Sequence, residues 1–321
     1  MQRDFPRIVF VGAHVEARLP LQHLISLREN VVGLLTLEPK SLARMSGGVE
    51  LGKIATAAGI PLSVVANINT AEALAWIQSC SPDLLLVVGW TQLLKPELLN
   101  VPRVAALGFH ASLLPKYRGR APVNWAIIHG EKETGNTLMV LDAAADEGDI
   151  VSQRRIPITE EDDCASVYHK VSLTECEMLD EVLPLIREGR MPRVKQDSVR
   201  SSLMPKRKPE DGVIDWGWPS QRLYNWIRAL THPYPGAFTY LTGQKISIWK
   251  ASLEGASARP LAMRVGSVQR SSDGYPLVAT GDGFLKLLCV SREDQPPISG
   301  MDAVHLFLEP PVTFESSGQR A

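Results

Sequence analysis

The sequence predicts an α/β protein with a doubly wound, mostly parallel sheet, followed by a small C-terminal β-barrel domain. In the first half, short runs that are apolar throughout alternate with segments of helical spacing, which is typical of a parallel sheet covered on both faces. In the last third, short β-like runs are separated by Gly and Asp turns, which favours a small barrel or sandwich.

The first half of the chain contains the apolar runs of the predicted sheet. Strands are expected at Arg7–Gly12, Val31–Leu37, 61–66, Asp83–Trp90 and Ala105–His110, with helices between them over 20–30, 50–59 and 70–80. Thr70 has a side chain suited to the N-cap of the third helix. Ligands of doubly wound sheets bind beyond the carboxyl ends of the strands, which is where Trp90 and His110 lie.

The rest of the chain predicts two domains joined by a linker. The alternation continues through a helix near 122–130, strands at 136–142 and 150–158, and a helix from about Cys164 to Arg187. We therefore expect an α/β domain over residues 1–190. Residues 191–208 are polar and basic with prolines among them, which predicts a linker. Residues 209–312 are expected to form a β-rich, OB-like domain with one helix before its strands.

Composition and charge limit the classes of function. The 321 residues carry 34 basic and 35 acidic side chains, so no global field attracts nucleic acid or an anionic membrane. The four cysteines are scattered, which argues against a disulfide framework or a zinc site and favours reduced thiols. The first apolar run is too short for a signal peptide, and no run approaches a membrane span. We expect a cytoplasmic protein without a membrane segment.

Common cofactor and nucleophile motifs are missing from the sequence. VGAHVEAR follows the first strand and contains no G-x-G-x-x-G, so a dinucleotide site is not supported. The chain has neither a P-loop nor a G-x-S-x-G elbow, and Ser112 beside His110 does not by adjacency make a nucleophile and base.

His110 is the strongest candidate for a catalytic residue. It stands at the carboxyl end of an apolar strand and is followed by the proline-containing, cationic segment 115–120. The acidic segment LDAAADEGDI follows another strand. We expect one of its carboxylates to meet His110 across the sheet, orient the imidazole and raise its pKa. The residues alone do not rank the four candidates, Asp142, Asp146, Glu147 and Asp149.

The stretch from His110 to Ile158 resembles the core of the 10-formyltetrahydrofolate-dependent formyltransferases. The family pattern is Asn-x-His, SLLP, RG and then D-x-G-D, and here HASLLP, RG and DEGD follow it. The likeness continues through THPYPGAF and GDG, so it covers most of the chain. In layout the chain is similar to sugar N-formyltransferases, including the one acting on UDP-4-amino-4-deoxy-L-arabinose, and to methionyl-tRNA formyltransferase. The resemblance implies a Rossmann-like catalytic domain and 10-formyltetrahydrofolate as co-substrate, without a metal.

The resemblance also implies roles for particular residues. The family's catalytic histidine corresponds to His110, and the aspartate that tunes it corresponds to Asp146. The backbone that holds the folate pterin corresponds to Gln92, Leu93 and Leu94. Arg120 matches an arginine that contacts folate or substrate, and the loop from Asp142 to Asp146 matches one that lines the folate.

Gly108 departs from the family pattern, which has asparagine two residues before the histidine. The asparagine amide is expected to donate a hydrogen bond to the oxyanion that forms when an amine attacks the formyl carbonyl. Losing one such donor typically costs about 100- to 1,000-fold in turnover. Either a backbone N–H, a water or the acceptor replaces it, or the catalysis is altered.

The favoured function is transfer of a formyl group to the amine of a small acceptor, a nucleotide-linked amino sugar. Lys116, Arg118 and Arg120 supply local positive charge for a diphosphate. Methionyl-tRNA is the alternative acceptor, disfavoured because segment 37–52 lacks a longer basic insertion and the net charge is −1. Hydrolysis of the formyl folate and a folate-binding domain without turnover also stay open, as does a homodimer.

Overall fold

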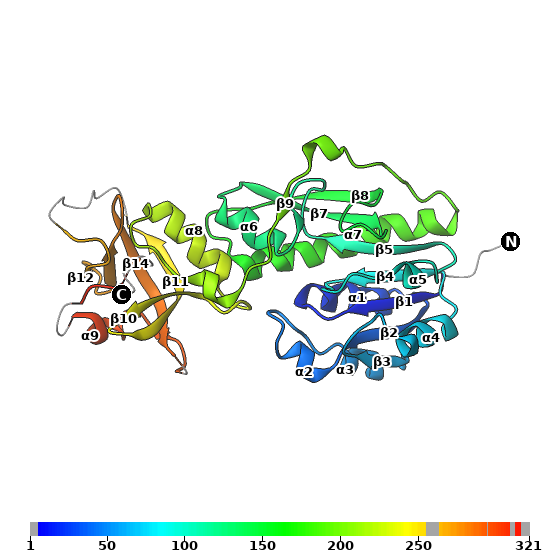
Figure 1. The fold of residues 1–321 in the computed structure, drawn as a ribbon, viewed down its shortest axis with the longest axis horizontal. Coiled ribbons are helices and arrows are strands. Elements are labelled where there is room, and N and C mark those ends of the chain that lie inside the picture. Colours follow the sequence, from blue (N-terminus) through cyan, green and yellow to red (C-terminus); the bar gives the residue numbers. More distant parts are fainter. Residues whose placement is uncertain (1–5, 255–262, 294, 309–311, 316–321) are drawn as a thin grey trace. The chain divides into compact units, whose positions relative to one another are not determined.

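The protein is described by a computed structural model over residues 6–254, 263–293, 295–308 and 312–315. The chain divides into two compact units. The first comprises residues 1–123, 132–158 and 166–206, and the second comprises 124–131, 159–165 and 207–321. Each unit is built on its own sheet (Figure 1).

The first unit contains a seven-stranded sheet in the order β3-β2-β1-β4-β5-β7-β8. Its strands are β1 Ile8–Gly12, β2 Val31–Leu37, β3 Leu62–Val65, β4 Leu84–Val88, β5 Ala105–His110, β7 Glu133–Val140 and β8 Ile150–Pro157. Strands β1 to β5 pair in parallel, while β7 is antiparallel to both β5 and β8. The loop between β7 and β8 is too short for a parallel crossover, which explains their antiparallel pairing. The mostly parallel sheet is thus confirmed.

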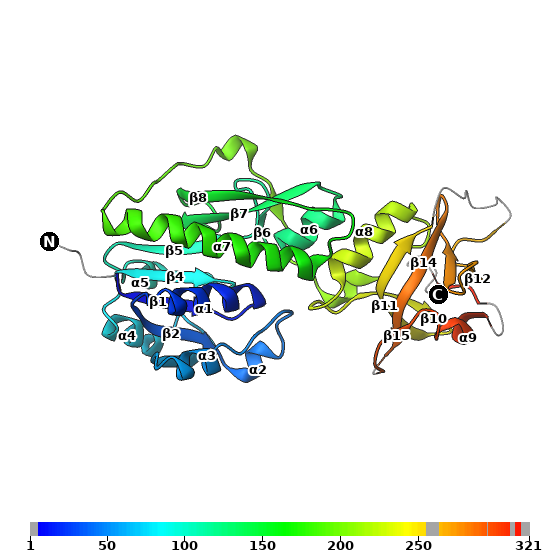
Figure 2. The ribbon, with the colours of Figure 1, turned by 180° about the vertical axis from the view of Figure 1, so that it is seen from behind.

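Helices cover both faces of this sheet. The face packed by Phe10, Leu86 and Leu107 is covered by α1 (Arg18–Ser26), α3 (Gly52–Ala57) and α7 (Cys164–Arg187), and Figure 2 shows α1 and α7 in front of the strands. The other face is covered by α4 (Ala71–Ser79) and α5 (Pro96–Leu99). The Thr70 hydroxyl accepts a hydrogen bond from the backbone N–H of Ala73, so the predicted N-cap of α4 is confirmed.

Strand register brings His110 to the carboxyl edge of the sheet. Val87 of β4 pairs with Gly108 of β5, and His110 pairs with Thr137 of β7. His110 is therefore the last residue of β5, at the edge where ligands of such sheets bind.

The segment predicted as a linker lies along the first unit for most of its length. Val194 forms a bridge with Ile150 of β8, and residues 198–200 form a short 3-10 helix. Strand β9 (Leu203–Met204) then pairs with β6 (Arg118–Gly119), which directly follows the SLLP loop. Two-residue strands have no detectable sequence pattern. The domain limits of 1–190 and 209–312 stay a prediction.

The second unit contains an antiparallel sheet in the order β10-β11-β14-β13-β12, with β15 paired to β14. Its elements are α6 (Pro122–Ile128, whose first two residues belong to the first unit), α8 Ser220–Leu230, β10 Ala237–Leu241, β11 Gln244–Leu253, β12 Val268–Arg270, β13 Pro276–Ala279, β14 Phe284–Arg292, β15 Ile298–Ser299 and α9 Val304–Leu308. Residues 312–315 form a bridge with β10 and another beside β12, so they join the two edges of the sheet. The separate antiparallel C-terminal domain is confirmed.

In the part of the chain that the structure describes, no helix has the length and apolar character needed to cross a membrane. The four cysteines are free thiols. Within the same described residues, no group of three or more His, Cys, Asp or Glu side chains could hold a metal ion.

Candidate active site

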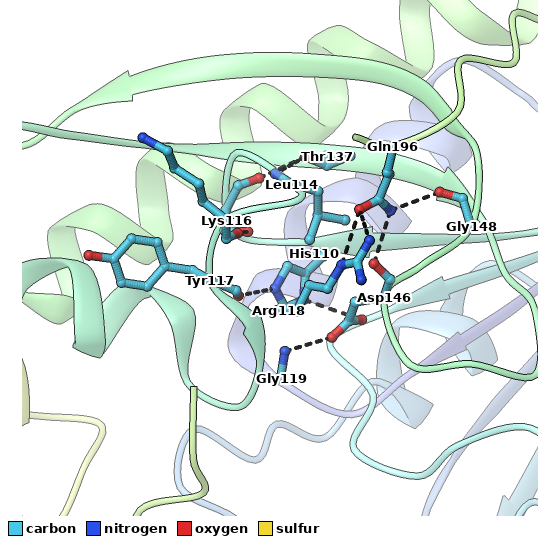
Figure 3. Close-up of polar contacts among 11 residues, drawn as sticks. His110, Leu114, Lys116, Tyr117, Arg118, Gly119, Thr137, Asp146, Gly148 and Gln196 are labelled. Atoms are coloured by element: carbon cyan, nitrogen blue, oxygen red, sulfur yellow. Dashed lines mark hydrogen bonds and ion pairs between the residues drawn. The ribbon is translucent and has the colours of Figure 1, made fainter. Parts of the chain in front are cut away.

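His110 is held between a backbone carbonyl and a carboxylate (Figure 3). Its Nε2 lies 2.7 Å from the Tyr117 carbonyl oxygen, and its Nδ1 lies 3.6 Å from Oδ1 of Asp146. A carbonyl oxygen only accepts, so Nε2 donates and carries the ring hydrogen. The neutral imidazole therefore has its lone pair on Nδ1, on the side of Asp146.

The SLLP loop fixes the carbonyl that His110 bonds. The Ser112 hydroxyl donates to the Lys116 carbonyl at 2.7 Å, and the Thr137 hydroxyl donates to the Ser112 carbonyl at 2.7 Å. Tyr117 has φ 58°, a left-handed conformation that non-glycine residues rarely adopt. These internal bonds hold the turn closed, so the Tyr117 carbonyl faces the imidazole.

Asp146 is the carboxylate of the acidic segment that meets His110. Its Oδ2 accepts a hydrogen bond from the Gly119 N–H at 2.8 Å, which ties the loop between β7 and β8 to β6. Asp146 has φ 58°, so the loop is strained at this residue. Asp142 instead accepts from Ala144 within its own loop, and Glu147 pairs with Arg118 at 3.0 Å. The geometry thus ranks candidates that the residues alone left equal.

Arg118 is buried, and its guanidinium is hydrogen-bonded to two other side chains. Its guanidinium donates to Oε1 of Gln196 through Nε at 3.2 Å and Nη2 at 2.8 Å, and it pairs with Glu147. The expectation that Arg118 joins Lys116 and Arg120 in a cationic surface is therefore wrong, because its side chain is only 8% exposed and its charge is already compensated. Lys116 and Arg120 are exposed.

Gly108 lies beneath an apolar side chain. A Cβ atom added here would approach Cδ2 of Leu141 to 2.6 Å and its Cγ to 3.1 Å. Leu141 packs with the core on the α4 face of the sheet. The space that an asparagine side chain would need at position 108 is therefore filled by Leu141, so the chain carries an apolar group beside this position.

The segment expected to hold the pterin, residues 92–94, is hydrogen-bonded to the neighbouring segment 66–69. The Gln92 side chain donates to the Ala66 carbonyl at 2.8 Å and accepts from the Ile68 N–H at 2.9 Å. The Leu93 carbonyl accepts from Asn69 at 2.8 Å, and Leu94 is buried. The Leu93 side chain is 65% exposed. The folate-binding roles of Gln92, Leu93, Leu94, Arg120 and Asp142 stay predictions.

Two features of this unit were not found from the sequence. Gln196 bonds to the Asp146 loop from a segment whose composition indicated only a linker. Glu175 of α7 is buried, and burial followed by the nearby Glu16 carboxylate raises its pKa well above the ordinary value. The nearby Asn136 side chain acts in the opposite direction and lowers the pKa of Glu175, but burial outweighs it. A single glutamate on an amphipathic helix gives no signal of such burial.

Comparison with known proteins defines the class. The family described as "Formyl transferase" matches residues 48–183, and "Formyl transferase, C-terminal domain" matches residues 206–306. The two matches cover more than half of the chain and fall on the α/β unit and the antiparallel unit. This protein belongs to the formyl transferase family, so the predicted resemblance and the formyltransferase class of enzyme are confirmed.

Individual relatives extend over both domains. A methionyl-tRNA formyltransferase of Geobacter metallireducens is 35% identical over 297 residues, covering 92% of this chain and 94% of the relative. One from Caldanaerobacter subterraneus subsp. tengcongensis is 34% identical over 294 residues, covering 89% and 92%.

Solved structures share the fold at lower identity. HypX from Aquifex aeolicus, in complex with tetrahydrofolic acid, has TM-score 0.67 and 19% identity, covering 96% of this chain and 48% of HypX. An N-formyltransferase from Helicobacter canadensis, with folinic acid and dTDP-3-aminofucose, has TM-score 0.62 and 18% identity, covering 88% and 98%.

Proposed function

We propose that this protein transfers the formyl group of 10-formyltetrahydrofolate to the amino group of methionyl-tRNA. The observation that carries the proposal is the match to methionyl-tRNA formyltransferases at 35% identity over 92% of this chain and 94% of the relative. It supports the tRNA acceptor better than the small amine that composition favoured. Folates bound in two structures of the same fold support the formyl donor.

His110 is the residue proposed to move the proton. The attacking amine must lose a proton as its bond to the formyl carbon forms, and the folate nitrogen must gain one as its bond breaks. With the hydrogen on Nε2 used by the Tyr117 carbonyl, Nδ1 is the ring atom able to accept a proton. The same atom returns it to the leaving nitrogen.

Asp146 is proposed to stabilise the imidazolium that this step creates. Its carboxylate Oδ1 lies 3.6 Å from Nδ1, and its Oδ2 is fixed by the Gly119 N–H. Opposite charges at this separation attract strongly in a site that is only partly solvated. Because His110 is 9% exposed, water screens the pair incompletely.

Gly108 and Leu141 make the oxyanion environment of this enzyme unlike the family pattern. Leu141 is apolar and fills the space beside position 108, so it donates no hydrogen bond to a developing oxyanion. A backbone N–H, a water or the acceptor must supply that donor. We expect chemistry slower than that of an enzyme with the asparagine, by up to about 100-fold.

A small amine acceptor is the second candidate, favoured by segment 37–52. This segment holds only a one-turn helix α2 (Pro39–Leu42) and is tied back to its own sheet. Gly48 forms a bridge with His14, and a Cβ atom added at Gly47 would lie 2.6 Å from Cδ2 of the His14 ring. A short, anchored segment offers little length for clamping a large polyanion.

Product analysis tests the proposed function. The purified full chain is incubated with radiolabelled 10-formyltetrahydrofolate and either initiator methionyl-tRNA or an amino-sugar nucleotide such as dTDP-3-aminofucose. Formyl-methionyl-tRNA is the expected product. Formylated sugar alone would establish the second candidate and overturn the first. Formate alone would indicate hydrolysis, and no product, with folate binding measured separately, would indicate folate binding without turnover.

A further inference from the structure

The segment following α7 runs along three parts of the candidate site. Val194 bridges Ile150 at the start of β8. Further on, the Ser202 hydroxyl accepts from the Tyr117 N–H at 2.9 Å, and β9 pairs with β6. We call residues 194–204 the strap. It therefore contacts the SLLP loop, the strand β6 that bonds Asp146, and the strand that follows the Asp146 loop.

Gln196 occupies the centre of the strap and uses its whole side-chain amide there. Oε1 accepts two hydrogen bonds from Arg118, at 3.2 Å from Nε and 2.8 Å from Nη2. Nε2 donates to the Asp146 carbonyl at 2.9 Å and to the Gly148 carbonyl at 2.8 Å. Figure 3 shows the amide lying between the guanidinium and the turn of the loop. Two donors and one acceptor atom are thus saturated.

The Asp146 loop needs this support because its own conformation is unfavourable. Asp146 adopts φ 58°, and such strain persists only where the surroundings over-determine it. Gly148 packs so closely on the Val140 carbonyl that a Cβ has no room. Most of segment 142–147 is exposed. The two carbonyls that Gln196 bonds lie on either side of Glu147, and Arg118 holds Glu147 itself at 3.0 Å.

We propose that Gln196, held by Arg118, is the positioning residue that keeps the Asp146 carboxylate at His110. This inference rests on the proposed roles of His110 and Asp146. Without the Gln196 amide, the loop relaxes from its strained turn, and Oδ1 moves away from Nδ1. A shift of about 1 Å in such a group costs on the order of 100-fold in rate. Because the loop from Asp142 to Asp146 is also predicted to line the folate, we expect a smaller change in folate binding beside the larger loss in rate.

Two substitutions distinguish the hydrogen bonds that the Gln196 side chain donates from those that it accepts. Gln196→Ala removes both donors and the acceptor. Gln196→Glu keeps the shape and the Arg118 contact at one oxygen, but its second oxygen replaces the Nε2 donor. A carboxylate oxygen cannot donate to the Asp146 and Gly148 carbonyls, so both hydrogen bonds are lost. Both should lower kcat by about 10- to 100-fold, which is more than they raise the KM for the folate. Val199→Ala is the matched control, since Val199 lies in the strap and its side chain is 91% exposed.

A double-mutant cycle with Asp146→Asn, in the folded full chain and with the acceptor that proves active, is the test. If Gln196 acts through Asp146, the double variant is no slower than the slower single variant. Factors that multiply, or a Gln196→Ala variant with wild-type kcat, would overturn the inference while leaving the proposed function intact. Wild-type kcat in Asp146→Asn would instead overturn the role of Asp146 and, with it, the positioning role of Gln196.

A second readout does not depend on the acceptor. In full chain labelled with ¹⁵N-histidine, the Nδ1 resonance of His110 should move in Gln196→Ala in the same direction as in Asp146→Asn, and stay in place in Val199→Ala. A His110 resonance that is unmoved in Gln196→Ala but moved in Asp146→Asn would contradict the positioning role.

Discussion

At the scale of the single residue, His110 carries the proposed chemistry and Asp146 supports it. Replacing His110 with Ala removes the proton acceptor at Nδ1, and Asp146→Asn removes the charge 3.6 Å away. Each should lower kcat by roughly 100-fold or more, because general acid–base groups contribute about 100- to 10,000-fold. Single-turnover kinetics with folate binding measured separately check this.

A histidine remote from the site provides the control for these two variants. His23 lies on α1 and pairs with Asp180 at 2.7 Å, so His23→Asn should keep wild-type kcat. Near wild-type kcat in His110→Ala, in a folded protein, would refute the role of this histidine.

Gly108 gives a prediction that depends on its neighbour. Because a Cβ at this position lies 2.6 Å from Leu141, Gly108→Asn alone should force the two apart and lower kcat by about 10-fold. Gly108→Asn with Leu141→Ala provides the room and restores the amide donor. The double variant should then exceed wild type, by up to about 100-fold.

Rates and thermal stability of the two variants decide whether position 108 faces the reaction. Unchanged kcat in both variants, with unchanged melting temperatures, would mean that this position does not face the reacting carbonyl.

The contrast between His110 and Leu141 shows what the sequence can reveal at this scale. A histidine closing an apolar strand is visible in the chain, and the family resemblance points to Asp146. The contact between Leu141 and Gly108 joins strand β5 to the residue that follows β7, and no local pattern encodes it. Arg118 was misjudged for the same reason, because its partners Glu147 and Gln196 lie far along the chain.

At the scale of the element, α7 contains a buried carboxyl group, Glu175, whose charged form is unfavourable at this position. Burial and Glu16 raise the pKa of Glu175, so the folded state favours the protonated carboxyl. Stability from this group is present at low pH and is lost as the pH rises toward the folded-state pKa. Glu175→Gln mimics the protonated form, so its stabilising effect should grow from pH 5 to pH 8.

The melting temperature measured at both pH values checks this prediction. Burial penalises the charged carboxylate more than the Asn136 side chain stabilises it, so Glu175→Gln should melt at a higher temperature than wild type at pH 8. Glu177→Gln is the matched control, since Glu177 is exposed on the same helix. A destabilised Glu175→Gln at pH 8 would show that the carboxylate has a favourable partner.

Elements were predicted best where the sequence has either a continuous apolar run or apolar residues at helical spacing. Strand β5 and helix α7 begin and end at the residues expected, because a continuous apolar run defines β5 and helical spacing defines α7. Strands β6 and β9 were missed because two residues carry no periodicity. The strap was expected to be a linker because its composition is polar. It is instead held in place by hydrogen bonds of its backbone and of Gln196, Asp197 and Ser202, which composition does not reveal.

At the scale of the whole molecule, the acceptor is the property that composition addressed least well. A net charge of −1 argued against a polyanion, yet relatives matched over both domains are methionyl-tRNA formyltransferases. Net charge averages over the surface, whereas a nucleic acid is bound by local groups. The formyltransferase class could be predicted because its motifs are local in sequence, and the acceptor could not.

The central claim is tested most directly by competition between initiator methionyl-tRNA and dTDP-3-aminofucose for limiting 10-formyltetrahydrofolate, at 50 and 200 mM salt. We expect formyl-methionyl-tRNA to dominate at low salt. The kcat/KM for methionyl-tRNA should fall between 50 and 200 mM salt, by about 40-fold if the enzyme makes three phosphate contacts. The yield of formyl-methionyl-tRNA should fall strongly in His110→Ala. Formylated sugar as the main product at both salt concentrations, with methionyl-tRNA unmodified, would contradict the claim.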